Sequence, residues 1–293
     1  MSDLLLPELL LFVLSVLCYV GAGVLSIIRL IGDRSRYGRL LTAFILLALA
    51  LAGGVLGLRA VEIRAFPLTS LFESMLLLTI VFGVLYLAFS AFLRQVWFSS
   101  VMIWVILAVI LMAGVVAEPA SQAHTAAAAT PWAITHGAAM ILGAASVLFA
   151  AANAALYLLG RHRLKNKQVT RVLGRMPDIE TLSRMNLYGL KFGFVLFSIG
   201  LAGGTGLVRL LGTGILHWLA DGKVITVIAL WLVLAVVLLL NHRSRLGDRT
   251  RAYVTIFALA LVLFAVLGVT VIGGTIHEFS SAPECLDGAV AFG

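Results

Sequence analysis

Two histidines stand at matching positions at the ends of two long apolar runs. His136 begins the run at residues 132–159, about one turn after Trp132, and His277 follows the run at residues 252–274. Imidazole is a good axial ligand of haem iron, and helical bundles often hold such sites between facing helices. Each histidine could instead lie at a membrane surface with one ring nitrogen in water. Both interpretations stay open, and the matched depth of the pair is what raises haem ligation to a hypothesis.

The stretch at residues 209–223, RLLGTGILHWLADGK, adds an aromatic ring and charges at the same depth. It joins two apolar runs, and polar and aromatic residues gathered at a membrane surface either anchor the neighbouring helices or build a binding site. The first alternative makes Trp218 an interface anchor, and Asp221 and Lys223 a solvated pair beside the turn at Gly222. The second makes the stretch a shelf for a flat apolar ligand, namely haem.

A carboxylate also enters an apolar run at this depth. Glu73 lies near the start of the run at residues 70–93, where its charge is costly unless it is paired or hydrated. The same residue fits the pattern of a helix start, with Thr69 or Ser70 as the N-cap. A site role and a capping role both stay open. The neighbouring candidates are Phe66, Pro67 and Phe72.

His242 lies at the opposite surface, after the run at residues 224–240 and beside Arg243 and Arg245. It could bind haem or another metal from the inner leaflet, or it could sit among lipid headgroups. The headgroup interpretation is favoured because the chain offers no partner histidine at that depth. A second subunit could supply one.

The composition predicts the elements that must position these residues. Of 293 residues, 62% are hydrophobic and 12% are charged, whereas a soluble domain is about half apolar and a quarter charged. We therefore expect an all-α integral membrane protein that forms one polytopic domain over residues 1–293. Spanning about 30 Å of hydrocarbon takes roughly 20 residues, and about eight runs are long enough. They lie at residues 5–30, 40–58, 70–93, 96–117, 132–159, 188–208, 224–240 and 252–274.

The placement of Lys and Arg predicts the orientation of these eight transmembrane helices. With the N-terminus outside, the loops after the first, third, fifth and seventh runs are inside and hold 17 of the 21 basic residues. The C-terminus, which follows the eighth run and carries no nearby Lys or Arg, also falls outside. The net charge of +8 then faces the anionic headgroups of the lipid bilayer and needs no nucleic acid as a partner. The outer side keeps Arg59, Arg64, Arg209 and Lys223.

The remaining motifs carry little chemistry. The inner linker at residues 160–187 predicts a short amphipathic surface helix after Pro177, with a docking site as the alternative. The glycine-rich residues 203–206 predict close helix packing, since no strand precedes them as a phosphate loop requires. Cys18 and Cys285 are expected at different depths, so a disulfide between them is not predicted.

Four stretches resemble the CcsA/ResC-type cytochrome c assembly proteins, a branch of the haem-handling superfamily that includes the CcmC and CcmF proteins. FPLTSLFESMLLL looks like the start of one of that family's spans, and PWAITHGAAMILGAASVLFAAANAALYLL is similar to its span with the first outer haem histidine. MPDIETLSRMNLYGLKFGFVLFSIGLAGG resembles its inner linker and next span. NHRSRLGDRTRAYVTIFALALVLFAVLGVTVIGGTIHEF is similar to its last inner loop and final span, which ends in the second outer histidine.

The resemblance implies that His136 and His277 are the outer axial ligands of haem b, and that His242 pairs with a histidine of a CcsB/ResB-like membrane subunit. It implies a multi-pass protein of a bacterial-type plasma (inner) membrane that holds haem at the outer face for attachment to apocytochrome c, as in a component of a cytochrome c haem lyase (synthase). The predicted haem-binding residues are His136, His277, His242, Trp218, Asp221, Trp132 and Glu73.

The signature loop departs from the family's motif, Trp-x-Trp-Asp-Pro-Lys-Glu. The corresponding residues 218–224 read WLADGKV, which keeps one Trp, the Asp and the Lys but lacks a Trp, the Pro and the Glu. Each lost aromatic contact removes about 0.5–1.5 kcal/mol of stacking beyond area burial. The departure favours, as the alternative, a non-catalytic HemX-like membrane regulator or an assembly or accessory subunit of a respiratory complex. A small-molecule transporter ranks last, since no paired broken helices occur in matching halves.

Overall fold

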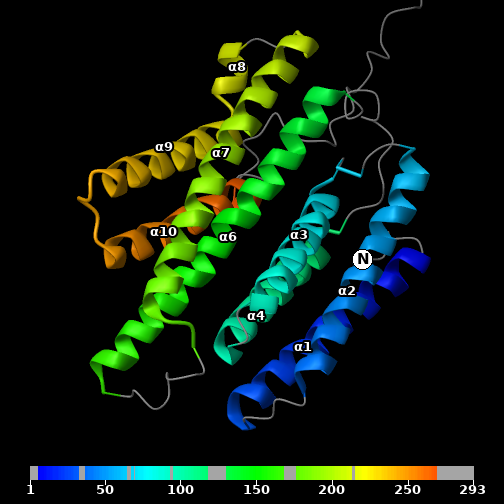
Figure 1. The fold of residues 1–293 in the computed structure, drawn as a ribbon. Coiled ribbons are helices and arrows are strands. Elements are labelled where there is room, and N and C mark those ends of the chain that lie inside the picture. Colours follow the sequence, from blue (N-terminus) through cyan, green and yellow to red (C-terminus); the bar gives the residue numbers. More distant parts are fainter. Residues whose placement is uncertain are drawn as a thin grey trace, which may run out of the picture.

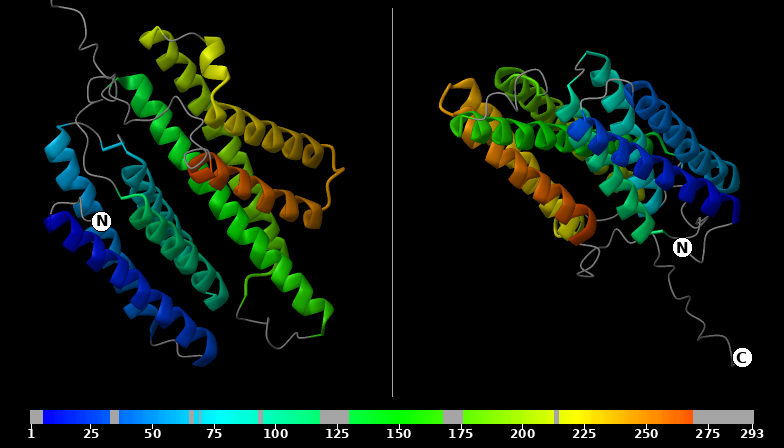
Figure 2. Two further views of the ribbon diagram at one scale, coloured as in Figure 1. Left: turned by 180° about the vertical axis from the view of Figure 1, so that it is seen from behind. Right: turned by 90° about the horizontal axis from the view of Figure 1, so that it is seen from below.

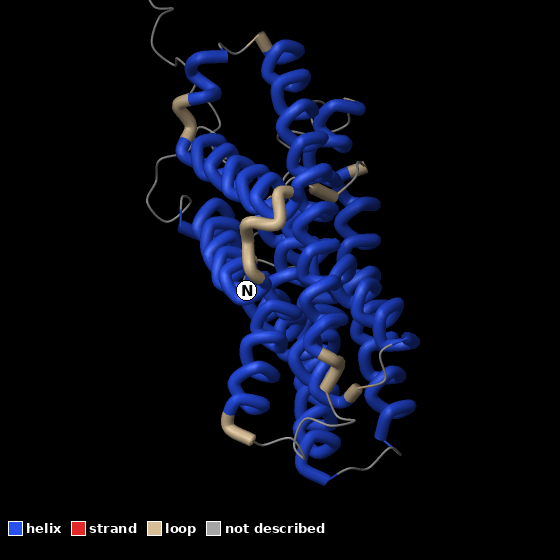
Figure 3. The backbone as a smooth tube through the Cα atoms, turned by 60° about the vertical axis from the view of Figure 1, so that its left-hand side comes forward, coloured by secondary structure: helices blue, strands red, loops and turns tan. Residues whose placement is uncertain are grey.

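The protein is a bundle of long helices. A computed structural model describes residues 6–32, 37–64, 67–68, 70–92, 95–117, 130–167, 176–212 and 215–268, and these residues contain no strand (Figures 1 and 3). The helices are α1 (Leu6–Gly32), α2 (Tyr37–Ile63), α3 (Leu71–Phe92), α4 (Val96–Val115), α6 (Pro131–Lys165), α7 (Ile179–Leu211), α8 (Ile215–Leu219), α9 (Gly222–His242), α10 (Asp248–Leu263) and the π-helix η2 (Phe264–Gly268).

Eight of these helices are long and apolar enough to cross a membrane, which confirms the predicted all-α class and span number. The short helix α8 lies between the sixth and seventh spans and had no counterpart among the predicted runs. The protein is therefore a multi-pass membrane protein. Its orientation in the membrane stays a prediction.

The bundle has two parts that meet at α6 (Figures 1 and 2). One apolar core joins α1 to α4 with one side of α6 and the starts of α7 and α10. A second core joins the other side of α6 with α7, α9 and α10. The α6–α7 pair has the most extensive contact in the molecule. Helices α9 and α10 lean across α6 and α7 at a wide angle, as two of the views show.

Successive long helices run in opposite directions, so each end of the bundle collects starts and ends alternately. The start of α6, the end of α7 and the start of α9 lie together, and we call this the His136 end. The start of α7, the end of α9 and the start of α10 lie at the other end, which we call the Arg251 end.

The predicted surface helix in the linker is wrong as a separate element. Helix α7 begins after Pro177, as expected, and Asp178 caps it by accepting a hydrogen bond from the backbone N–H of Thr181 at 2.9 Å. The helix then continues without a break into the sixth span. Its first turns pack inside the bundle, because Leu182 is fully buried and Asn186 donates to the Ala150 carbonyl of α6 at 3.0 Å.

Candidate functional site

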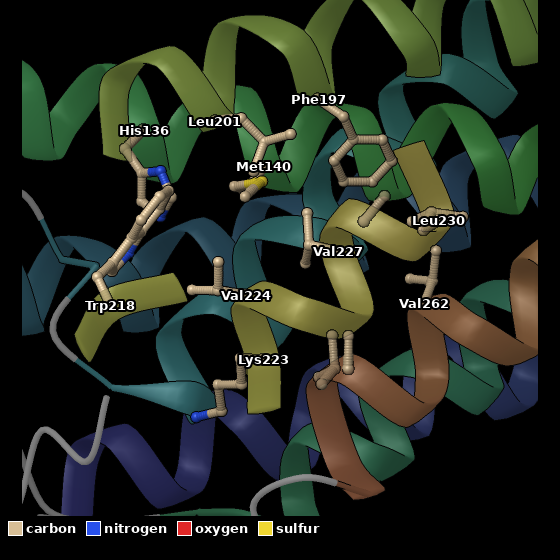
Figure 4. Close-up of a pocket in the computed structure, with 13 residues that line it drawn as sticks. His136, Met140, Phe197, Leu201, Trp218, Lys223, Val224, Val227, Leu230 and Val262 are labelled. Atoms are coloured by element: carbon tan, nitrogen blue, oxygen red, sulfur yellow. The ribbon is translucent and has the colours of Figure 1, made fainter. Parts of the chain in front are cut away.

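An apolar cleft of about 190 Å³ lies beside His136, between α6, α7, α8, α9 and the α10–η2 segment (Figure 4). The rings of His136 and Trp218 lie next to each other at one end of it. Apolar side chains from four helices form most of the remaining wall, among them Met140, Phe197, Leu201, Val227, Leu230 and Val262.

The start of α6 fixes the position of His136. Thr130 is the N-cap, and its hydroxyl oxygen accepts a hydrogen bond from the backbone N–H of Ala133 at 3.3 Å. Pro131 occupies the first helical turn, where its missing N–H costs nothing. His136 follows in the second turn, half-buried and facing α7.

The ring of His136 is held by the backbone of α7. Its Nδ1 lies 2.7 Å from the carbonyl oxygen of Gly200. A carbonyl oxygen can only accept, so Nδ1 carries the proton, and in the neutral ring the lone pair belongs to Nε2. Metal-binding histidines commonly donate one ring N–H to a carbonyl and ligate through the other nitrogen.

The glycines at residues 203–206 serve close helix packing, as predicted. A Cβ added to Gly203 would lie 3.2 Å from the backbone nitrogen of His136, and one added to Gly206 would lie 2.5 Å from Cε3 of Trp132. Trp132 is half-exposed and lies at the same end as His136, but it does not line the cleft.

The segment after α7 brings Trp218 to the cleft. Gly212, with φ +68°, ends α7 in the left-handed conformation that favours glycine, and α8 follows. Trp218 is buried against Val208 and Val224, so its indole lies inside the protein and contributes to the cleft wall.

Asp221 is a helix cap, and its interpretation as half of a solvated pair is wrong. The side chain is 2% exposed and accepts hydrogen bonds from the backbone N–H groups of Lys223 at 2.8 Å and Val224 at 3.3 Å. It satisfies donors that the start of α9 would otherwise leave open. Lys223 lines the cleft, with its ammonium pointing away from His136.

Glu73 closes the predicted capping box with Ser70. The Ser70 N–H donates to Glu73 Oε2 at 3.2 Å, and the Glu73 N–H donates to Ser70 Oγ at 3.2 Å. Thr69, the other predicted cap, and the neighbouring Phe66 lie outside the described residues. Glu73 does not line the cleft.

A buried ionic cluster surrounds Glu73. Arg59 Nη1 lies 3.2 Å from Glu73 Oε1 and Arg59 Nε lies 3.4 Å from Glu8 Oε1, with all three side chains at most 2% exposed. The guanidinium also lies 4.5 Å from the centre of the Phe72 ring. From the sequence, Arg59 was predicted only as one of the outer basic residues. The sequence did contain a signal for this cluster. Arg59 directly follows the second apolar run, at the same membrane depth as Glu8 and Glu73 near the starts of the first and third runs.

The segment before α3 connects this cluster to the histidine. A Cβ added to Gly137 would lie 2.9 Å from Cδ1 of Leu68. Leu68 therefore packs against α6 at Gly137, the residue that follows His136. Two residues later in the same segment, Ser70 is hydrogen-bonded to Glu73 of the ionic cluster.

The other predicted histidines do not join His136 among the described residues. His242 is the exposed last residue of α9, whereas the cleft lies at its first turn, about 30 Å away for a helix of this length. His277 lies outside the described residues, so its approach to His136 stays a prediction. Within the described part of the chain, no three His, Cys, Asp or Glu side chains are grouped to hold a metal ion.

Two similarities to known proteins identify the family of this chain. The chain is 26% identical over 248 residues to "Cytochrome c biogenesis protein CcsA" from Guillardia theta, an alignment that covers 77% of this chain and 80% of that protein. The sequence model of the family described as "Cytochrome C assembly protein" matches residues 68–277, which include the His136 cleft but neither Glu8 nor Arg59. This match covers most of the chain, which therefore belongs to the cytochrome c assembly protein family.

Proposed function

We propose that this protein holds haem at the outer face of the membrane for attachment to apocytochrome c. Membership of the family gives the chain a role in cytochrome c biogenesis. The single observation that carries the finer proposal is His136 at the end of an apolar cleft, with its Nδ1 hydrogen-bonded to the Gly200 carbonyl. This bond leaves Nε2 as the nitrogen that would ligate the iron.

The shape of the cleft suits one edge of a porphyrin. Its volume of about 190 Å³ is below the roughly 300–1,000 Å³ of small-molecule sites. We therefore expect haem to insert one apolar edge and to leave the rest of the ring outside. The Trp218 indole beside His136 offers a stacking surface worth about 0.5–1.5 kcal/mol beyond area burial.

The second axial ligand in this proposal is His277. The π-helix η2 contributes Ala265 and Val266 to the cleft, and His277 follows η2 in the sequence. Two axial imidazoles and one stacking ring would fix the plane of haem b. The protein then supplies orientation and redox poise, while the thioether bonds form between the haem vinyl groups and the apocytochrome thiols.

A membrane partner is part of the proposal. In the most apolar stretch of α9, 22% of the residues are buried inside the protein, against 33–67% in the corresponding stretches of the other seven spans. Helix α9 therefore leaves the largest share of its residues for contact with lipid or another subunit. His242 is exposed at the end of the same helix. We propose that a CcsB/ResB-like subunit packs there and supplies a second histidine for a haem at His242.

An absorption spectrum of the purified protein tests the haem site. We expect a Soret band in the wild type that shifts or disappears in His136→Ala. The matched control is His162→Ala, an exposed histidine at the far end of α6 that contacts Asn166. A missing Soret band, or one that His136→Ala leaves unchanged, would contradict the proposal.

The signature loop, which lacks a Trp, the Pro and the Glu of the motif, supports one competing function, the non-catalytic regulator or accessory subunit. Trp218 is the one tryptophan that residues 218–224 keep from the motif. If the protein presents haem for attachment, Trp218→Ala should reduce the cellular amount of mature cytochrome c. Normal maturation in the Trp218→Ala strain, with the protein present at its usual level, would favour the competing function.

A further inference from the structure

Three glycines of α7 line the surface that the histidine ring meets. Gly200, Gly203 and Gly204 are three and four residues apart, so they share one face of the helix. Gly200 accepts the hydrogen bond from His136 through its carbonyl. Gly203 contacts the His136 backbone, and Gly204 lies under its ring.

Gly204 is in contact with both aromatic rings at the end of the cleft. A Cβ added there would lie 3.1 Å from Nδ1 and 3.2 Å from Cε1 of His136, and 3.3 Å from Cζ2 of Trp218. All three distances are shorter than ordinary van der Waals contact. Neither ring could stay where it is if residue 204 carried a side chain.

We propose that Gly204 is a positioning residue for His136, because the space it leaves lets the imidazole reach the Gly200 carbonyl and take the Nδ1-protonated form. This inference rests on the proposed haem site and names the residue that prepares the ligand. Its link to chemistry is the tautomer: the hydrogen bond to Gly200 assigns the proton to Nδ1 and the lone pair to Nε2.

The substitution Gly204→Ala crowds the His136 ring and forces a shift of a few tenths of an ångström. The added methyl group meets Nδ1 from the α7 side, and Trp218 lies against the same point. A shift of the His136 ring away from α7 lengthens its 2.7 Å hydrogen bond to the Gly200 carbonyl. A longer bond favours the Nδ1-protonated tautomer less, so part of the population carries its proton on Nε2, and that nitrogen then cannot ligate iron.

Two alanine substitutions serve as matched controls. At Gly193, in the same α6–α7 interface, an added Cβ would lie 3.0 Å from Cγ2 of Val147 and would not touch the His136 ring. At Gly57, in α2, no atom lies within 4 Å of an added Cβ. Gly193→Ala therefore reports the cost of crowding the helix interface, and Gly57→Ala reports the effect of alanine in a helix.

The first measurement needs no haem. Ring-nitrogen chemical shifts of isotope-labelled histidine, in detergent-solubilised protein above the ordinary pKa of histidine, identify the protonated nitrogen of His136 by comparison with His136→Ala. We expect Nδ1 protonation in the wild type, Gly193→Ala and Gly57→Ala, and a mixture of tautomers in Gly204→Ala. A wild-type tautomer in Gly204→Ala, or the same mixture in Gly193→Ala, would overturn the inference.

The second measurement is a haemin titration followed in the Soret band. Loss of such a second-sphere contact typically weakens metal binding about 10- to 100-fold, and we expect this loss for Gly204→Ala with partial recovery of the wild-type spectrum on adding imidazole. Gly193→Ala should bind as the wild type does. If the wild type binds no haemin, the proposed function fails, while the tautomer comparison still decides the role of Gly204.

Discussion

The same helices meet in opposite ways at the two ends of the molecule. At the His136 end, α6 and α7 approach over glycines, and a cleft remains beside α9. At the Arg251 end, α7, α9 and α10 close around a buried arginine. Glycines without side chains form the helix contact at the His136 end, whereas a long polar side chain, that of Arg251, fills the other end.

Arg251 makes five hydrogen bonds at the closed end. Its Nε donates to Asn186 Oδ1 at 3.3 Å, and its Nη2 donates to Asp248 Oδ1 at 2.7 Å. Further bonds reach Asn241 and both the carbonyl and the hydroxyl of Ser183. Asn186 extends the network by donating to Thr255 Oγ1 at 2.9 Å.

This difference indicates that the Arg251 end contributes mainly to stability and the His136 end mainly to binding. In a membrane interior, helices gain little from apolar burial against each other, so close packing and interhelical hydrogen bonds hold them together. The Arg251 end has many such bonds. At the His136 end, Gly203 and Gly204 let α6 approach α7 closely, and the apolar cleft lies beside the His136 ring. We therefore expect substitutions at the Arg251 end to change mainly stability, and substitutions at the His136 end to change haem binding.

Arg251→Met should give the largest change in stability. Four of its hydrogen bonds join α10 to α7 or α9. Interhelical hydrogen bonds in membranes are worth about 0.6 kcal/mol each, so losing these four removes about 2.4 kcal/mol from the free energy of unfolding. Unfolding in mixed detergent micelles measures this loss. Haemin affinity at the cleft should stay within about twofold of the wild type once the protein is folded.

The control for Arg251→Met is Arg249→Met. Arg249 is exposed and lies 5.7 Å from the centre of the Tyr253 ring, so its loss should change stability little. If Arg251→Met lowers haemin affinity as much as Gly204→Ala does, stability and binding do not depend on separate ends. The Arg251 hydrogen bonds would then also determine the structure of the cleft.

Local pattern was sufficient to predict most of the fold. The eight apolar runs, the helix start after Pro177 and the capping box of Ser70 and Glu73 were all predicted from spacing and are confirmed. These features depend on residues close together in the sequence. The predicted start of the sixth span at residue 188 came too late because polar residues before it, such as Ser183 and Asn186, are buried in the bundle and bonded to Arg251.

The site was predicted only in part, because its contacts join distant residues. Spacing placed His136 and Trp218 at one depth, and the structure brings them together. No local pattern could show that the Gly200 carbonyl accepts a hydrogen bond from His136, or that Arg59 pairs with acids of two other helices. The alternative that placed Asp221 in a solvated pair is wrong because side-chain type alone does not distinguish a surface charge from a buried cap. Its predicted role in haem binding stays a prediction.

Asp221→Ala, at the His136 end, should lower the free energy of unfolding by an intermediate amount and should also weaken haemin binding. Loss of an N-cap costs about 0.5–2 kcal/mol in the free energy of unfolding. Because Asp221 also fixes the turn between Trp218 and α9, we expect the tryptophan fluorescence of the folded protein to shift and haemin affinity to fall about tenfold, the equivalent of about 1.4 kcal/mol.

The matched control for Asp221→Ala is Asp178→Ala, the N-cap of α7 at the other end. It should lose a similar or smaller amount of stability without any change in haemin binding. Equal effects of both substitutions on haemin affinity would show that cap loss, and not the position of Trp218, is responsible.

Ser198→Ala should give a smaller effect, between the two ends. Trp231 Nε1 donates to Ser198 Oγ at 2.7 Å, and the Trp231 ring stacks on Phe194 at 5.3 Å between centroids. Removing this single α7–α9 hydrogen bond should cost about 0.6 kcal/mol and at most about 1.7 kcal/mol in unfolding free energy. Ser146→Ala is the control, because Ser146 is bonded only to the Leu142 carbonyl of its own helix among the contacts described. A loss equal to that of Arg251→Met would mean that the middle of the bundle, and not its closed end, holds α9 in place.

Asp178 should give the smallest effect, which appears only in acid. Hydrogen bonds from Thr181, first from its hydroxyl and then from its backbone N–H, hold the pKa of the Asp178 carboxyl below its ordinary value, and the side chain is exposed. A carboxyl with a lowered pKa in the folded protein stabilises it fully above the unfolded pKa of about 3.9, and this contribution is lost as the pH falls through the folded pKa. Unfolding measured across this acidic range should therefore depend slightly less on pH in Asp178→Asn than in the wild type. An identical pH dependence would mean that the exposed cap, unlike the buried Asp221, adds nothing through its charge.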